Sequence, residues 1–271
     1  MTRPYAEVIG DPVDHSLSPA IHSFWLKALD IDASYGRRRV SRADLPGYLA
    51  EKRIDPAWRG ANVTMPLKLD AVSLADSASD RAVAAGAANL LMMREGRLAA
   101  ANTDVGAIDV LLVKLHEAKV RMGSVTLLGN GGAARAALVA LKLLGITNVR
   151  VQARHVAEAR KLAVEFGLMT APALFTEPIV SDGLINATPL GMPGRDCLNC
   201  DLQHMPAGGW VFDMTYGPNE SPLITAARQA GLHAVDGLQM LVEQAASSFE
   251  LFFGQKPPRD RDGELWQVPH Q

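Results

Sequence analysis

The stretch Ser124-Val-Thr-Leu-Leu-Gly-Asn-Gly-Gly-Ala-Ala-Arg-Ala136 decides the fold of this chain. Its apolar beginning is typical of a parallel strand that is buried on both faces. The pattern Gly129-x-Gly131-x-x-Ala134 follows this strand and opens a helix expected to run to about Leu144. In a dinucleotide site, the first glycine permits a tight turn, the second lets the backbone approach a pyrophosphate, and Ala here stands where helix meets strand. The helix N-terminus offers free N–H groups to phosphates. The alternative is a strand-to-helix turn without a ligand.

Strands and helices alternate on both sides of this stretch. After it, strands are expected at 148–152, 183–187 and 210–214, and helices at 156–166 and 238–253. Before it, strands are expected at 6–10, 35–40 and 60–64, a hairpin at 87–93 and 97–101, and helices from Pro19 with Ser18 as cap, at 44–52, over most of 69–84 and at 106–119. This alternation predicts an α/β fold with a doubly wound parallel sheet.

A second informative stretch is Asn62-Val-Thr-Met-Pro-Leu-Lys68. Pro66 fixes its own φ and pushes the preceding residue toward an extended conformation. We therefore expect a rigid, non-helical turn that aims Thr64 and Lys68 at fixed points. A lysine held in this way suits acid–base chemistry or anion binding. The alternative is a solvated loop lysine.

Bulk composition excludes several classes of protein. The chain has 271 residues, of which 48% are hydrophobic and 21% charged, with a net charge of −2. This balance argues against a nucleic-acid binder, which needs a basic stripe. No apolar run approaches the roughly 18 residues of a membrane span. The N-terminus lacks the apolar core of a signal peptide, so we expect a cytoplasmic protein.

The two cysteines do not predict a metal centre. Cys197 and Cys200 are spaced C-x-x-C, with His204 just beyond. A structural zinc site needs four ligands, and a second Cys/His pair is missing. We expect a polar loop with reduced thiols and no metal.

The second strand after the glycine pattern bears on the choice of nucleotide. A site for NAD usually places Asp or Glu about 20 residues on, whereas a site for NADP often uses Arg there. Here the strand ends Gln152-Ala-Arg-His155, with Arg154 and no carboxylate. The sequence favours NADP. The alternative is that Arg154 is an ordinary surface residue.

With these motifs placed, the chain resembles the shikimate dehydrogenases. The resemblance runs in order from about residue 5 to 254 and rests on short motifs, whose ordered combination is specific. The matching segments are His15-Ser-Leu-Ser-Pro19, Asn62 to Lys68, Gly86-Ala-Ala-Asn89, Asn102-Thr-Asp104, the glycine loop, Asn186-Ala-Thr-Pro-Leu-Gly-Met192, Asp213-Met-Thr-Tyr216 and Gly237-Leu-Gln-Met-Leu-Val-Glu-Gln244.

The resemblance implies two domains and a reaction. Residues 1–105 and 238–271 would form an α/β substrate-binding and catalytic domain, and residues 106–237 an NADP-binding Rossmann-type domain. The implied reaction is the reversible, NADPH-dependent reduction of 3-dehydroshikimate to shikimate, a step of chorismate and aromatic amino acid biosynthesis. We expect Lys68 and the glycine loop to face each other, because ligands in such sheets sit at the carboxyl ends of the strands. Monomer and homodimer both remain open.

The resemblance also assigns roles to residues. Lys68 matches the acid–base residue and Asp104 its partner, which also contacts substrate. Ser16 and Ser18 match residues that bind the substrate carboxylate, with Tyr216 helping, and Thr64, Asn89 and Gln244 match hydroxyl binders. The matched cofactor positions are Asp80, Gly129, Asn130, Gly131, Gly132, Ala133, Arg154, Thr188, Met214 and Gly237.

The sequence departs from the family pattern at four places. The Asn-Arg-Thr segment reads Ala153-Arg154-His155, and Glu158 replaces a second basic residue. One arm of the 2′-phosphate clamp is therefore missing, and use of NAD becomes possible. Leu90 and Val105 replace a threonine and a glycine that we expect near the substrate cleft.

These departures keep other functions open. One is an NAD(P)-dependent quinate/shikimate paralogue with altered activity, and another is a bifunctional folate-type dehydrogenase, which does not explain the Ser-Leu-Ser segment. A different class is a nucleotide-sensing regulator without turnover. An intact Lys68 and Asp104 argue against the regulator, since a sensor has no need of an acid–base pair.

Overall fold

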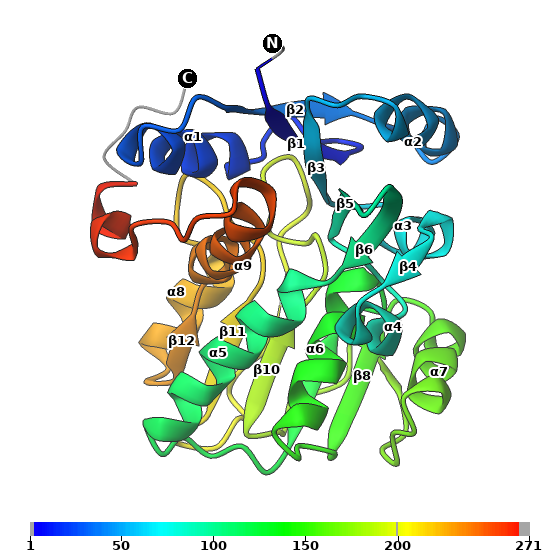
Figure 1. The fold of residues 1–271 in the computed structure, drawn as a ribbon. Coiled ribbons are helices and arrows are strands. Elements are labelled where there is room, and N and C mark those ends of the chain that lie inside the picture. The colour runs from blue at the N-terminus through cyan, green and yellow to red at the C-terminus, as the bar shows by residue number, and fades with distance from the viewer. Residues whose placement is uncertain (1–2, 199, 266–271) are drawn as a thin grey trace. The chain divides into compact units, whose positions relative to one another are not determined.

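The computed structural model describes residues 3–198 and 200–265. The chain divides into two compact units. Figure 1 shows the helices and strands of both, coloured by residue number. Unit 1 comprises Met1–Thr103 and Val242–Gln271, and unit 2 comprises Asp104–Leu241. The end of the expected substrate domain, residues 266–271, lies outside the described residues, as does Asn199 of the C-x-x-C stretch.

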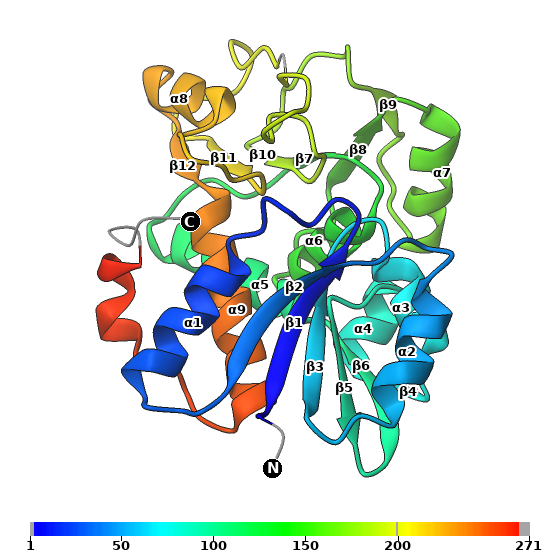
Figure 2. The same cartoon turned by 90° about the horizontal axis from the view of Figure 1, so that it is seen from above.

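Unit 1 contains a mixed six-stranded sheet of order β2-β1-β3-β5-β6-β4. β1 pairs in parallel with both β2 and β3, and these three strands run side by side in Figure 2. β5 is antiparallel to β3 and β6, which confirms the expected hairpin. The elements are β1 (Tyr5–Gly10), α1 (Ser18–Ala28), β2 (Ser34–Arg39), α2 (Leu45–Arg53), β3 (Trp58–Val63), α3 (Lys68–Leu74), β4 (Ser77–Ala78), α4 (Asp80–Ala85), β5 (Leu90–Arg94), β6 (Arg97–Ala101) and the 3₁₀ helix η1 (Arg259–Glu264).

Two local predictions for unit 1 can be compared with the structure. Residues 69–84 are mostly helical, as expected, but in two helices, because β4 pairs with β6 and Ser79 then caps a new helix by accepting a hydrogen bond from the Ala82 N–H at 3.3 Å. Ser18 is not the cap of α1. It is the first residue of that helix, Leu17 holds the cap position, and no side chain caps there.

Unit 2 contains an all-parallel six-stranded sheet of order β12-β11-β10-β7-β8-β9. Counted within the unit, this is the 3-2-1-4-5-6 arrangement of a doubly wound dinucleotide fold, so the α/β, Rossmann-type prediction is confirmed. The strand order reverses between β7 and β10. The elements are α5 (Thr103–Glu117), β7 (Val125–Leu128), α6 (Gly132–Leu143), β8 (Val149–Ala153), α7 (Val156–Glu165), β9 (Ala173–Leu174), β10 (Gly183–Asn186), β11 (Trp210–Asp213), α8 (Pro222–Gln229), β12 (His233–Val235) and α9 (Gly237–Phe253), which belongs to unit 1 from Val242 on.

Burial explains why the central strands of unit 2 are apolar. Every residue of β7, β10 and β11 is buried, as both faces of a parallel sheet are covered by helices. α6 buries seven residues against this sheet, beginning with Ala134 at 0% exposure. Across the described residues, no helix is both long and apolar enough to cross a membrane.

Candidate active site

The glycine loop of unit 2 lies at the carboxyl end of β7. Gly129 has a φ of +106°, which L side chains rarely adopt, and a Cβ there would lie 3.1 Å from the Ala187 carbonyl oxygen. Its N–H donates to the Gln152 carbonyl at 2.9 Å, so the loop is fixed between the ends of β8 and β10. Gly131 and Asn130 are exposed, and a Cβ on Gly131 would meet no heavy atom within 4 Å. The open backbone before α6 suits close approach of a phosphate.

Two buried side chains fix the loops that follow β10 and β11. The Asn186 amide donates to the Asp213 carboxylate at 2.9 Å and accepts from the Thr188 N–H at 3.0 Å. Asp213 in turn accepts hydrogen bonds from the Thr215 N–H at 3.0 Å and the Ser221 hydroxyl at 2.6 Å. These bonds hold Thr188 and the segment around Met214 in fixed positions. Both predicted site residues are half-buried.

Gly237 begins α9 directly against the loop after β11. A Cβ at this position would lie 2.2 Å from the Thr215 carbonyl oxygen and 2.7 Å from that of Met214. Both obstacles are main-chain atoms, so no side chain can move aside to make room. Only glycine allows the helix to start this close to Met214.

We expect Gly237→Ala to lower the free energy of unfolding by about 1–3 kcal/mol, because the methyl group overpacks a rigid contact. Urea unfolding measures this change. Gly47→Ala is the matched control, since a Cβ on Gly47 in α2 meets no heavy atom within 4 Å. Alanine in a helix is favoured over glycine by about 0.5–1 kcal/mol, so the control should gain stability. Equal midpoints for Gly237→Ala and the wild type would contradict this contact.

The end of β8 presents basic side chains to solvent. Arg154 and His155 are both exposed and directly follow the strand whose Gln152 carbonyl holds the glycine loop. Glu158 is exposed in the first turn of α7, and its carboxylate accepts a hydrogen bond from Lys161 at 2.9 Å. The negative charge of Glu158, which would repel a 2′-phosphate, is thus partly neutralised by Lys161 on the same helix.

Arg135, in the helix that follows the glycine loop, forms an ion pair with Glu165. It makes a bidentate pair with Glu165, with both N–O distances at 2.6 Å. The guanidinium holds the pKa of Glu165 below its usual range. This pair joins α6 to α7, so Arg135 serves packing near the nucleotide end of the unit.

In unit 1, main-chain bonds fix the turn that carries Thr64 and Lys68. The Thr64 N–H donates to the Ile9 carbonyl at 2.9 Å, and the Ala88 N–H donates to the Lys68 carbonyl at 2.8 Å. A Cβ on Gly10 would lie 2.3 Å from the Thr64 methyl carbon, so the turn packs tightly on the end of β1. Thr64 and Lys68 are half-buried, and Lys68 opens α3 at the end of the expected turn.

Asn89 and Gln244 are brought together although they are far apart in sequence. The Asn89 amide donates to Thr103 Oγ1 at 2.9 Å and, at 3.5 Å, to Gln244 Oε1. Asn89 Oδ1 accepts from the Thr103 N–H at 2.7 Å. The Asn89 main-chain carbonyl accepts from the Val63 N–H at 2.8 Å, which places Asn89 beside the Thr64 turn.

Ser16 and Ser18 lie where the loop after β1 enters α1. Ser16 Oγ accepts from the Ser18 N–H at 3.3 Å. Ser16 is half-buried and Ser18 is 4% exposed. The loop returns to the Thr64 turn, because the Asp11 N–H donates to the Met65 carbonyl at 3.0 Å.

The remaining predicted positions are more dispersed. Asp104 is 4% exposed in the first turn of α5, and Tyr216 is half-buried after β11. Asp80 is exposed at the start of α4 in unit 1, whereas the glycine loop belongs to unit 2. Leu90 and Val105 are both 0% exposed, so these departures from the family pattern lie in the core.

Sequence reasoning missed the residues that hold the site residues in place. Asn186 and Asp213 stand in the matching segments but were assigned no role from the sequence, although each fixes a loop of unit 2. Thr103 was likewise only a letter of the Asn-Thr-Asp segment. A polar residue at the last position of an apolar, buried strand is the signal that could have identified the first two.

The C-x-x-C stretch was considered above as a metal site. Among the described residues, no three His, Cys, Asp or Glu side chains gather to hold a metal ion. Cys197 is exposed, and burial together with Asp201 raises the pKa of the Cys200 thiol to about 11.

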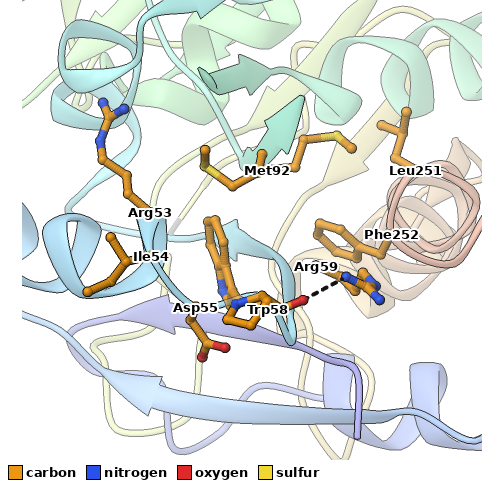
Figure 3. A pocket seen from close by; sticks show the side chains of 10 residues that line it. Arg53, Ile54, Asp55, Trp58, Arg59, Met92, Leu251 and Phe252 are labelled. Carbon is orange, nitrogen blue, oxygen red and sulfur yellow. Dashed lines mark hydrogen bonds between the residues drawn. The ribbon is translucent and has the colours of Figure 1, made fainter. Parts of the chain in front are cut away.

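A surface hollow of about 410 Å³ lies elsewhere in unit 1. Figure 3 shows its lining by Trp58, Met92, Phe252 and neighbouring side chains, with Arg59 donating to the Pro56 carbonyl at 3.1 Å. No residue predicted for the site is among those that line it, so this hollow is separate from the positions described above.

Comparison with known proteins identifies related sequences. Residues 8–91 match the family described as shikimate dehydrogenase substrate binding domain, and residues 237–261 match shikimate 5′-dehydrogenase C-terminal domain. The chain is 41% identical to shikimate dehydrogenase (NADP(+)) of Sphingopyxis alaskensis over 97% of this chain and 95% of the relative. It is 39% identical to the Caulobacter vibrioides protein of the same name, over 92% and 90% of the two chains.

Solved structures give the same picture. Shikimate 5-dehydrogenase from Thermus thermophilus, solved with NADP(H) and shikimate, has a TM-score of 0.83 and 35% identity and covers 97% of this chain and 98% of its own. Quinate dehydrogenase from Corynebacterium glutamicum, solved with NAD, has a TM-score of 0.85 and 29% identity over 98% and 99% of the two chains. The match extends over nearly the whole length in both sequence and structure, and the chain belongs to the shikimate dehydrogenase family.

Proposed function

We propose that the protein is an NADP-dependent shikimate dehydrogenase, which reversibly reduces 3-dehydroshikimate to shikimate. The observation that carries the proposal is the 41% identity over 97% of the chain with a relative named shikimate dehydrogenase (NADP(+)). The ordered motifs, from Ser16 to Gln244, support it. The pathway that this reaction serves is the synthesis of chorismate and aromatic amino acids.

The residues present fit a nicotinamide dinucleotide. Gly131 leaves open backbone at the N-terminus of α6, where N–H groups can bind a pyrophosphate. We assign phosphate binding to residues 129–133, the 2′-phosphate to Arg154, and the nicotinamide half to Thr188, Met214 and Gly237. Asp80 is kept as a further proposed contact. When bound, NADPH supplies the hydride for the reaction.

The proton of the reaction is assigned to Lys68. Carbonyl reduction needs a proton at the oxygen as hydride arrives at carbon, and a positioned lysine can donate it. The main-chain bond from Ala88 to the Lys68 carbonyl fixes the base of that side chain. Asp104 is the proposed partner that orients the ammonium group and contacts substrate.

Substrate recognition is assigned to neutral polar groups. Ser16 and Ser18 would bind the carboxylate with help from Tyr216, and Thr64, Asn89 and Gln244 would bind ring hydroxyls. The Asn89 N–H reaches Gln244 Oε1 over 3.5 Å, a longer hydrogen bond than the one to Thr103 at 2.9 Å, so a substrate hydroxyl would compete for this longer bond.

Quinate dehydrogenation is the second candidate, supported by the structural likeness to a quinate dehydrogenase solved with NAD. Leu90 and Val105 had suggested a shifted substrate range. Both side chains are fully buried, next in sequence to Asn89 and Asp104, which are themselves 2% and 4% exposed. The higher identity to a shikimate dehydrogenase, 41% against 29% for the quinate dehydrogenase, favours shikimate as the main substrate. We further propose a cytoplasmic location. The protein is proposed to be a monomer or a homodimer, and sedimentation of the purified protein would distinguish these two states.

The test is paired kinetics with the pure protein. NADP⁺ and NAD⁺ are each offered with shikimate and with quinate, and reduced cofactor is followed by absorbance. We expect the highest kcat/KM for NADP⁺ with shikimate. A preference for quinate would select the second candidate, and no reduction of either cofactor by either acid would refute both.

A further inference from the structure

A buried hydroxyl, that of Ser248, lies where three segments of unit 1 converge. Ser248 is 0% exposed on α9, one turn after Gln244, and donates to the Gln244 main-chain carbonyl at 2.9 Å. It accepts a hydrogen bond from Asn62 Nδ2 at 2.8 Å and lies 3.3 Å from Thr103 Oγ1. It therefore links α9 to the end of β3 and the start of α5.

Proton counting gives this hydroxyl a defined orientation. A serine has one hydrogen and two lone pairs. The hydrogen goes to the Gln244 carbonyl and one lone pair accepts from Asn62. The other lone pair faces Thr103 Oγ1, which accepts from the Asn89 amide at 2.9 Å. The single Thr103 hydroxyl hydrogen is shared between Asn89 Oδ1 at 3.2 Å and Ser248 Oγ at 3.3 Å, so Ser248 contacts the hydroxyl that holds both ends of the Asn89 amide.

Aromatic packing fixes the far side of this group of hydrogen bonds. Tyr35 donates to Asn62 Oδ1 at 2.7 Å, which leaves Asn62 Nδ2 to point toward Ser248. The Tyr35 ring stacks on His22, with centroids 3.9 Å apart and planes at 6°. Burial lowers the pKa of His22 to about 3, so this neighbour is a neutral ring near pH 7.

We propose that Ser248 is a positioning residue that acts through Thr103 to set the orientation of the Asn89 amide and thereby the selectivity for hydroxylated ring acids. The inference rests on the proposed function, since the Asn89 amide is an assigned hydroxyl binder. It goes beyond that function by naming a residue that contacts no substrate. Ala245 and Ala246, at 0% and 9% exposure on the same helix, show that α9 needs no hydroxyl to pack in this region.

Ser248→Ala removes the hydroxyl and leaves an Asn62 N–H without its acceptor. We expect the KM for shikimate to rise about tenfold, which corresponds to about 1.4 kcal/mol. The KM for NADP⁺ should stay within about twofold of the wild type, because the nucleotide is assigned to other residues. A variant that is merely less stable would lose active enzyme, so kcat would fall while both KM values stayed constant.

Ser247→Ala is the matched control. Ser247 is the exposed neighbour on α9, and its hydroxyl reaches only the Glu243 carbonyl, at 3.4 Å. Tyr35→Phe is the second variant, since it keeps the ring on His22 and removes the bond that orients Asn62. Its KM for shikimate should rise about threefold.

The outcomes separate the two proposals. If the wild type oxidises shikimate and both variants keep the KM of Ser247→Ala, Ser248 has no positioning role. If Ser248→Ala does not fold, Tyr35→Phe decides alone by the same criterion. A wild type that neither binds shikimate by calorimetry nor oxidises it would overturn the proposed function and this inference together.

Discussion

Lys68→Ala is expected to lower kcat for shikimate oxidation by about 10²–10⁴-fold, the range for loss of a general acid–base group. The binding of shikimate should remain largely in place, because the carboxylate and hydroxyl binders are other residues. The main-chain frame should also persist, since the turn is held by the Thr64 N–H and the Lys68 carbonyl rather than by the lysine side chain. Turnover is measured by the absorbance of reduced cofactor, and the binding of shikimate is measured separately by calorimetry.

Lys68→Arg sharpens this test. Arginine keeps the positive charge but stays protonated, so it can serve as an anion hook and not as an acid–base group. If Lys68 only attracts the substrate, Lys68→Arg should retain activity; if it transfers the proton, both variants should be nearly inactive. Lys27→Ala, which removes an exposed lysine from α1, is the control. Full activity in Lys68→Ala would refute Lys68 as the acid–base group and with it the proposed mechanism.

Unit 2 was predictable because its signals are local. The apolar run before Gly129 marks a doubly covered strand, and the glycine positions follow from a turn geometry that the structure contains, with φ of +106° at Gly129. Strand–helix alternation then leaves few topologies open. The observed 3-2-1-4-5-6 order is the one that alternation and the glycine pattern together favour.

Short elements were not predictable in the same way. β4, β9 and β12 have two or three residues each, too few for a period to show. β4 exists because Ser77 and Ala78 pair with β6, a contact that the sequence from 69 to 84 does not reveal. Ser18 resembled a cap by type and by the following proline, but the chain enters α1 one residue earlier than that pattern suggests.

In the candidate site, too, local signals could be predicted and contacts between remote residues could not. Residues that stand in ordered motifs, such as Lys68 and Arg154, could be named from the sequence. Residues that hold them could not, because their partners are remote: Asn62 and Ser248 are 186 positions apart and meet only in the folded chain. The residue type at position 248 does not indicate this buried contact, since serine is usually a surface residue.

Arg154→Ala is expected to raise the KM for NADP⁺ by about tenfold to a hundredfold and to change the KM for NAD⁺ by less than about threefold. The two cofactors differ by the 2′-phosphate, and a hydrogen bond to a charged group contributes about 1.5–3 kcal/mol. Arg154 is exposed, and the strand it follows shares a main-chain hydrogen bond with the glycine loop. Steady-state kinetics at low and high salt measure the effect, which should shrink as salt screens the exposed charge.

The controls for Arg154 follow from the charges around it. Arg160 is an exposed arginine on α7, the helix that follows Arg154, and Arg160→Ala tests whether any nearby positive charge lowers the KM for NADP⁺. Glu158 stands where the family pattern has a basic residue, yet Lys161 lies 2.9 Å from its carboxylate. Because that pair is nearly neutral, Glu158→Gln should lower the KM for NADP⁺ by no more than about threefold. If Arg154→Ala leaves the ratio of the two KM values unchanged, selection for NADP must come from residues other than Arg154, and the missing second arm at Glu158 would then mark a site that does not read the 2′-phosphate.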